Sequence, residues 1–123
     1  MIMLKDNHVD YAGGIIPAIQ RANEYLKANN KDLKIEIEVR NEDELNEVLS
    51  FGGVDRIMLD NFTPERISKV LPFIPSQYET EASGGITIDN IRAYAETGIQ
   101  FISVGALTHS VKSLDMSLKA SFG

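Results

Sequence analysis

Ile35-Glu36-Ile37-Glu38-Val39 and, further along the chain, Arg56-Ile57-Met58-Leu59-Asp60 are the two stretches that decide the fold. In both, apolar residues at alternate positions share one face of a strand, and mostly polar residues share the other. An open sheet covered by helices on both sides needs apolar residues on both faces. A parallel β/α barrel is covered by helices on its outside, and its inner side chains point toward a site at the mouth. The alternation therefore favours a barrel over an open doubly wound sheet.

The rest of the chain alternates between short apolar runs and segments of helical period, which predicts an α/β fold. Helices are expected over residues 15–28 and after Asn41, Thr63 and Asp89. The five expected strands span residues 2–5, 34–39, 56–60, 78–82 and 101–104. Closed barrels usually have about eight strands. We therefore predict a partial parallel β/α barrel whose open edge needs another segment or a second copy to cover it.

The composition is that of an ordinary globular protein of one domain, with 123 residues, 43% of them hydrophobic and 24% charged. The net charge of -6 argues against a nucleic-acid or acidic-lipid surface, because no surplus of Lys and Arg faces the phosphates. The absence of cysteine excludes disulfides and thiolate metal sites and makes a cytoplasmic location the default expectation. No apolar run approaches the roughly 18 residues of a membrane span.

Polar residues that follow the strands are the first candidates for a site, because the active sites of parallel barrels form from these loops. Lys5 ends the first strand in Lys5-Asp6-Asn7-His8, where its ammonium group is a point charge for an anionic oxygen. A solvated turn explains the same four residues. His8 is the weaker candidate of the two, since a lone histidine in a loop is often merely exposed.

Two carboxylates are expected to meet at the ends of consecutive strands. Glu38 and Asp60 share one face there, and they suit either Mg²⁺, which prefers oxygen ligands, or ribose hydroxyls. An ion pair with Lys5 or Arg56 is the alternative interpretation. Glu36 shares this face at a deeper position, which makes it a weaker candidate for the site and a candidate buried partner for a cation.

Two glycine-containing segments follow the last two strands. Ser83-Gly84-Gly85 leads toward a helix expected near residues 87–89, so backbone N–H groups and a helix N-terminus are placed to face an anion. The segment from Gly105 to His109 closes the fifth strand in the same manner. Barrel enzymes commonly bind phosphate with the loops after their last two strands. The alternative is that the glycines only make tight turns.

Taken together in chain order, these motifs closely resemble those of the quinolinate phosphoribosyltransferases. Each motif is modest alone, and five in sequence are specific. The matching segments are Lys5-Asp6-Asn7-His8, Glu36-Ile37-Glu38-Val39, Met58-Leu59-Asp60-Asn61, Glu81-Ala82-Ser83-Gly84-Gly85-Ile86 and Ser103-Val104-Gly105-Ala106-Leu107-Thr108-His109-Ser110.

The resemblance implies a Mg²⁺-dependent enzyme that converts quinolinate and phosphoribosyl pyrophosphate into nicotinate mononucleotide, pyrophosphate and CO₂ in NAD biosynthesis. It also implies an α/β barrel preceded by a separate domain, and a homodimer or higher homo-oligomer. By resemblance, Lys5 contacts substrate anions, while Glu38 and Asp60 serve the ribose hydroxyls and the metal. The residues expected at the phosphate of the phosphoribosyl group are Ser83, Gly84, Gly85, Gly105 and His109.

The chain departs from the family in length. Family members are considerably longer, so residues 1–123 are expected to be the C-terminal part of the barrel domain, without the N-terminal domain and the first barrel strands. The missing part of the family pattern includes the basic residues that clamp the quinolinate carboxylates, and the five arginines here form no recognisable clamp. Two alternatives stay open: a phosphate-binding half-barrel without catalysis, and another phosphate-binding barrel enzyme.

We expect the 123-residue chain, assayed alone, to show little or no turnover, because the dicarboxylate clamp is unaccounted for. The measurement is quinolinate-dependent release of CO₂ in the presence of phosphoribosyl pyrophosphate and Mg²⁺. Release at a rate typical of enzymes, about 1 s⁻¹ or more, would contradict this expectation.

Overall fold

The computed structural model describes residues 1–104 and 110–112, and it forms one sheet with helices packed along it. The strands lie side by side in the order in which they occur in the chain. Neighbouring strands are parallel from β1 to β5, and β6 runs antiparallel to β5. The strands are β1 (Ile2–Leu4), β2 (Ile35–Val39), β3 (Arg56–Asp60), β4 (Glu79–Ser83), β5 (Phe101–Ser103) and β6 (Ser110–Lys112). This sequential parallel order is that of a barrel arc, since doubly wound sheets reverse their strand order, and it confirms the predicted fold.

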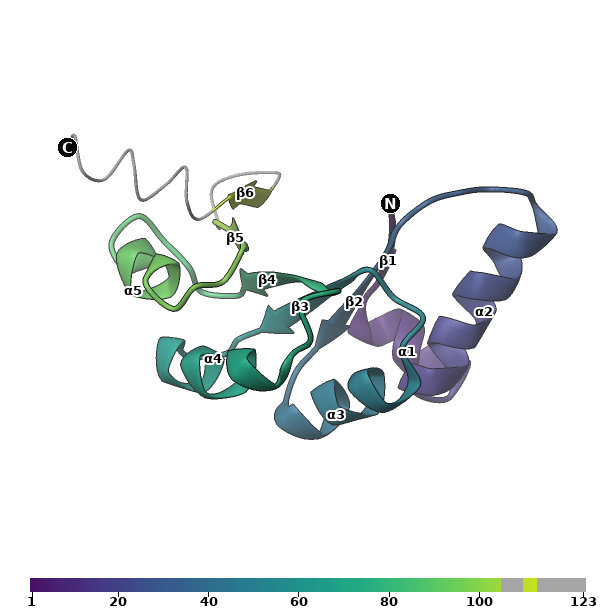
Figure 1. The fold of residues 1–123 in the computed structure, drawn as a ribbon, viewed down its shortest axis with the longest axis horizontal. Helices are drawn as coiled ribbons and strands as arrows, with labels where there is room; N and C mark the ends of the chain where they lie inside the picture. The colour runs from purple at the N-terminus through teal and green to yellow at the C-terminus, as the bar shows by residue number, and fades with distance from the viewer. Residues whose placement is uncertain (105–109, 113–123) are drawn as a thin grey trace.

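The helices follow the strands and gather on one side of the sheet. They are α1 (Asp6–Ala12), α2 (Ile15–Ala28), α3 (Glu42–Phe51), α4 (Pro64–Val70), the 3₁₀ turn η1 (Leu71–Phe73) and α5 (Ile91–Ala95). Helices α2 to α5 form an arc along the outer side of the strands (Figure 1). Among the described residues, no helix has both the length and the apolar character needed to cross a membrane.

Two predicted helix starts are confirmed by their caps. The side chain of Asn41 accepts a hydrogen bond from the Glu44 backbone N–H at 2.9 Å, ahead of α3. Thr63 does the same for the Arg66 N–H at 3.2 Å, and Pro64 occupies the first position of α4. Such side chains satisfy N–H groups that have no partner within the helix.

Two expectations about local structure were wrong, and one strand was missed. Residues 6–12 form α1 instead of a loop. Val9 is the one buried residue of this short helix, so the sequence shows no apolar stripe of helical period there. Helix α5 begins at Ile91 rather than at Asp89, after a turn in which the Asn90 side chain accepts from the Thr87 N–H at 2.8 Å. Strand β6 was not predicted at all.

The core lies between the sheet and the arc of helices. It is built from outward-facing strand residues that are fully buried: Ile37, Val39, Ile57, Leu59, Ala82 and Ile102. The opposite, inner face carries the alternate residues, and the parallel register sets them side by side across strands. Glu36 pairs with Arg56, Met58 with Glu81, and Asp60 with Ser83. The fold thus separates an apolar outer face from a polar inner one, as the alternation predicted.

Candidate functional site

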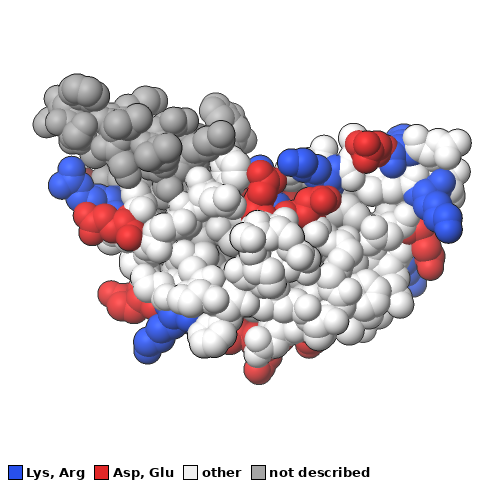
Figure 2. Space-filling model, viewed as in Figure 1, with Lys and Arg blue, Asp and Glu red and all other residues white. Residues whose placement is uncertain are grey.

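Three inner-face side chains lie where β2, β3 and β4 end. Asp60 and Ser83 are register partners, and the Ser83 hydroxyl donates a hydrogen bond to Asp60 Oδ1 at 3.2 Å. Glu38 stands at the end of β2, on the other side of β3 from Ser83. All three are partly buried. Figure 2 shows acidic and basic side chains meeting along the hollowed upper edge of the molecule.

The surroundings of Glu38 are electrostatically mixed. Partial burial raises the pKa of its carboxyl group, and the nearby Asp60 and Asp6 carboxylates raise it further. A backbone hydrogen bond from Asp6 and the Lys5 ammonium act in the opposite direction. Glu38 is therefore close enough to both Asp60 and Lys5 to interact with each electrostatically. The assignment of these three residues to one site stays a prediction. A site with two adjacent carboxylates attracts a cation or the hydroxyl groups of a sugar.

The carboxylates of Glu38 and Asp60 offer oxygen ligands of the kind that Mg²⁺ prefers. Within the described residues, no three Asp, Glu, His or Cys side chains group so that they alone could hold a metal. Mg²⁺ is usually bound by one or two carboxylates, with water and substrate phosphates completing its six ligands. Glu38 and Asp60 fit that manner of binding, and they do not fit a metal held by protein alone.

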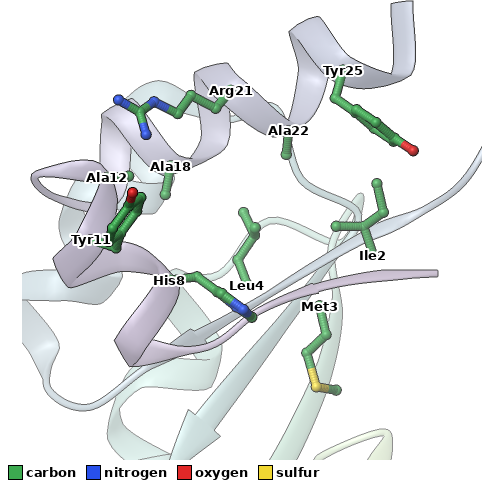
Figure 3. A pocket seen from close by; sticks show the side chains of 10 residues that line it. All are labelled: Ile2, Met3, Leu4, His8, Tyr11, Ala12, Ala18, Arg21, Ala22 and Tyr25. Atoms are coloured by element: carbon green, nitrogen blue, oxygen red, sulfur yellow. The ribbon is translucent and has the colours of Figure 1, made fainter. Parts of the chain in front are cut away.

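Lys5 and His8 have different surroundings, although they belong to one motif. Lys5 precedes α1, and its backbone N–H donates to His8 Nδ1 at 3.3 Å, so the imidazole closes the start of the helix. His8 also lines an apolar groove of about 470 Å³ beside β1, together with Leu4 and Tyr11 (Figure 3). Within residues 1–104, no hydrogen bond or ion pair joins His8 to either carboxylate of the site. The structure thus brings Lys5, and not His8, to Glu38.

The Leu-Asp-Asn and Ser-Gly-Gly motifs interlock. Asn61 has a left-handed backbone with φ 59°, and its N–H donates to the Ser83 carbonyl at 2.8 Å. Gly84 has φ +91°, and a Cβ added there would lie 2.5 Å from Asn61 Oδ1. Glycine at 84 is therefore required by the contact itself, which supports the tight-turn interpretation for this residue. The role of Ser83, Gly84 and Gly85 in binding phosphate stays a prediction.

The expected helix N-terminus does not lie directly behind the glycine pair. The turn before α5 uses the Thr87 N–H for Asn90, and Asn90 Nδ2 donates back to the Gly85 carbonyl at 2.9 Å. An anion-binding helix start at residues 87–89 was therefore a wrong prediction. Gly105 and His109, the other expected phosphate ligands, lie outside the described residues.

Below the site, the inner face holds a charge cluster that sequence reasoning only touched on. Arg56 Nη1 pairs with Glu81 Oε1 at 3.3 Å and Nη2 with Glu79 Oε1 at 3.4 Å, and its guanidinium stacks on the Phe101 ring at 3.8 Å. The alternative of an ion pair between Arg56 and Glu38 or Asp60 is thereby excluded. The signal for these pairs was in the sequence, since Glu79 and Glu81 alternate as Glu36 and Glu38 do.

Glu36 belongs to the same cluster, but it does not pair with a cation. Its side chain is 1% exposed, and it hydrogen-bonds to Glu81. Burial above all, together with the hydrogen bond and the charge of Glu81, raises the pKa of Glu36 to about 8. Glu36 therefore keeps its proton at neutral pH and forms no ion pair with Arg56, its neighbour on β3, so the expected role as a direct partner of a cation was wrong.

The chain matches a known protein family over almost its whole length. The family model described as quinolinate phosphoribosyl transferase, C-terminal domain, matches residues 1–119. The chain belongs to the quinolinate phosphoribosyltransferase family. The resemblance carried by the five motifs is thereby confirmed at the level of the family.

Relatives and solved structures agree with this membership. The chain is 41% identical to the chloroplastic nicotinate-nucleotide pyrophosphorylase (carboxylating) of Arabidopsis thaliana, over 97% of this chain and 38% of the relative. It is 42% identical to the probable nicotinate-nucleotide pyrophosphorylase of Bacillus subtilis (strain 168), over 95% of this chain and 39% of the relative.

Among solved structures, the enzyme from Ehrlichia chaffeensis superposes with a TM-score of 0.76 at 37% identity, over 88% of this chain and 38% of that one. The enzyme from Francisella tularensis superposes with a TM-score of 0.75 at 39% identity, over 90% and 38%. The chain thus spans well under half the length of these quinolinate phosphoribosyltransferase relatives.

Gly84→Ala tests the contact that joins the two motifs, and Gly85→Ala is its matched control. Both residues have positive φ, +91° and +70°, so alanine is strained at each by roughly 1–2 kcal/mol. Only at 84 does the new methyl group also collide with Asn61, because nothing lies within 4 Å of a Cβ at 85. We expect urea denaturation to show a free energy of unfolding lower by roughly 1 kcal/mol or more in Gly84→Ala than in Gly85→Ala. Equal losses would contradict the interlock.

Glu36→Gln tests whether Glu36 keeps its proton in the folded chain. Since the pKa of Glu36 is raised to about 8 in the folded chain from 4.5, the folded state keeps a proton that the unfolded state loses. Its contribution to stability is present below about pH 4.5 and disappears as pH rises toward 8. Glutamine mimics the protonated acid, so the loss of unfolding free energy between pH 5 and pH 8 should shrink by on the order of 1–3 kcal/mol.

The control for this measurement is Glu47→Gln, at an exposed position of α3, which should leave the pH dependence as it is. Urea denaturation at both pH values supplies the comparison. If the unfolding free energy of Glu36→Gln changes between pH 5 and pH 8 as much as that of the unchanged chain, Glu36 is ionised in the folded chain.

Proposed function

We propose that this chain carries the phosphoribosyl-binding half of a quinolinate phosphoribosyltransferase site. The reaction is transfer of the phosphoribosyl group to quinolinate with decarboxylation, which gives nicotinate mononucleotide, pyrophosphate and CO₂ in NAD biosynthesis. The observation that supports it best is that Glu38, at the end of β2, is within electrostatic reach of both the Asp60 carboxylate and the Lys5 ammonium group. Membership of the family supplies the reaction.

The two carboxylates would bind the ribose hydroxyls and Mg²⁺. The metal, when bound, would neutralise the charge that develops on the departing pyrophosphate. Glu38 and Asp60 place negative charge beside the ribose, which stabilises a transition state in which that ring becomes positive. Partial burial of both side chains strengthens this effect, because the local dielectric is lower than that of water.

Anion binding is assigned to the rim of the same face. Lys5 would contact substrate anions, and Ser83, Gly84 and Gly85 would hold the phosphate of the phosphoribosyl group. Gly105 and His109 would bind the same phosphate. His8, which belongs to the same motif as Lys5, would also contact substrate. Catalysis would come mainly from positioning and charge stabilisation. When the bond to CO₂ breaks, its electron pair would stay on the ring carbon, stabilised by the cationic pyridinium nitrogen, and a proton would then bind that carbon in place of CO₂.

The complete activity is proposed for a larger assembly than these residues. The relatives are much longer than this chain, and the basic clamp for the quinolinate carboxylates is assigned to the part they have in addition. We also propose a homodimer or higher homo-oligomer, because the first strand of the arc pairs on one side alone within the described residues. A cytoplasmic location is proposed from the lack of cysteine.

Glu38→Gln and Asp60→Asn test the site directly. Each change removes one charge and keeps the shape, so binding of phosphoribosyl pyrophosphate with Mg²⁺, measured by calorimetry, should weaken about tenfold or more. Asp43→Asn on the exposed surface of α3 is the matched control and should bind as the unchanged chain does. Unaltered affinity in both site variants, or no binding by the unchanged chain, would contradict the proposal.

A further inference from the structure

Arg40 connects three elements around the end of β2. It follows Val39, the last residue of that strand, and so lies two residues after Glu38 in the chain. Its guanidinium contacts Glu44 in α3 and two aspartates in α1. No motif of the sequence analysis includes Arg40, and the proposed function assigns it no role.

On the α3 side, the guanidinium is held by a forked interaction. Arg40 Nη2 lies 2.9 Å from Glu44 Oε2, and Arg40 Nε donates to Glu44 Oε1 at 3.3 Å. The Arg40 backbone N–H also donates to Glu44 Oε1, at 2.7 Å. Glu44 is itself placed by its backbone bond to Asn41. Two parallel bonds between arginine and a carboxylate fix the orientation of the guanidinium plane.

On the other side, the same guanidinium reaches α1. Nη1 lies 3.6 Å from Asp6 Oδ2, and Nη2 lies 3.6 Å from Asp10 Oδ1. Asp6 and Asp10 are one helical turn apart, so they share a face of α1. The backbone of Asp6 hydrogen-bonds to Glu38, and Lys5 directly precedes it. The start of α1 therefore lies between Arg40 and the carboxylate site.

Helix α1 needs tertiary contacts to hold its position. It has seven residues, and Val9 is its one buried side chain. Helices this short are not stable alone, and tertiary contacts hold them in place. Single surface ion pairs contribute little, but a forked pair within a network of several charges is the exception. Arg40 is also surrounded by three carboxylates, which leaves its charge balanced and a poor ligand for a substrate anion.

We propose that Arg40 is a positioning residue that fixes the start of α1 against β2 and thereby sets Lys5 opposite Glu38. Its effect on substrate binding rests on the proposed function, whereas its effect on α1 does not. The two effects are measured separately in the following experiment.

The first measurement is amide hydrogen exchange of the full 123-residue chain by NMR. In Arg40→Gln, the amides of Asp6 and of Val9, which donates to the Lys5 carbonyl at 3.0 Å, should exchange roughly tenfold faster. Arg66→Gln is the matched control, because Arg66 makes a comparable forked pair with Glu42, at 2.7 and 3.0 Å, between α4 and α3. It should leave these two amides unchanged.

Arg40→Lys separates position from charge. Lysine keeps the positive charge but cannot form the fork with Glu44, so we expect Asp6 and Val9 to exchange faster here too. Native exchange in Arg40→Lys would reduce the role of Arg40 to its charge and overturn the proposal, as would native exchange in Arg40→Gln. If Arg40→Gln does not fold, Asp10→Asn, which changes an exposed contact of the same network, must accelerate the two amides or the proposal fails.

The second measurement is the affinity for phosphoribosyl pyrophosphate with Mg²⁺. We expect roughly three- to tenfold weaker binding in Arg40→Gln and Arg40→Lys, with Arg66→Gln unchanged. Faster exchange with unaltered affinity would overturn the link between Arg40 and the substrate. If the unchanged chain does not bind phosphoribosyl pyrophosphate, the proposed function fails, and the exchange data still decide whether Arg40 positions α1.

Discussion

The parallel register of β2, β3 and β4 is the constraint on which the rest of this structure depends. Helices cover the outer face of the sheet, so outward side chains in these strands are mostly apolar, and Ile37, Ile57 and Ala82 are fully buried there. Thr80, the register partner of Ile57, is the buried polar exception. Because side chains alternate, polar residues are directed to the inner face. The register then sets them opposite one another, which is how Asp60 comes to meet Ser83. A shift of one residue would exchange the two faces.

An inner face with this many charges has to balance them, and it does so in two layers. In the deeper layer, Arg56 forms ion pairs with Glu79 and Glu81, and Glu36 keeps a proton. The charges of these three described carboxyl groups are therefore either paired or neutralised. In the upper layer, at the ends of the strands, Glu38 lies near Asp60, and among the described residues Lys5 and the backbone of Asp6 offset part of the charge of Glu38. The upper layer is the one left with negative charge to offer a ligand. The same strand pattern thus gives a deeper layer of ion pairs and an upper layer that is the candidate for binding a ligand.

The family motifs acquire distinct physical meanings in this arrangement. Asn61 and Gly84 hold two neighbouring loops together through backbone and side-chain contact, which explains why those residue types occur there without reference to a ligand. Lys5 and His8 are three residues apart, yet one lies beside the carboxylates and the other closes a helix and lines an apolar groove. A shared motif therefore combines residues for the fold with residues for the site, and only contacts tell them apart.

The amino-acid sequence by itself determined the α/β class, the barrel arc, the strand faces and the helix caps at Asn41 and Thr63, because these follow from local periodicity and from hydrogen bonds over three residues. It also indicated that Glu38 and Asp60 meet, since alternation and strand ends suffice to place them. The tertiary structure alone decided that residues 6–12 form a helix, that Arg56 pairs with Glu81 rather than with the site, and that Glu36 keeps a proton. These outcomes depend on burial and on contacts between residues distant in the chain. Alternation in the sequence indicates that Glu79 and Glu81 share the inner face, but it does not show which cation they meet.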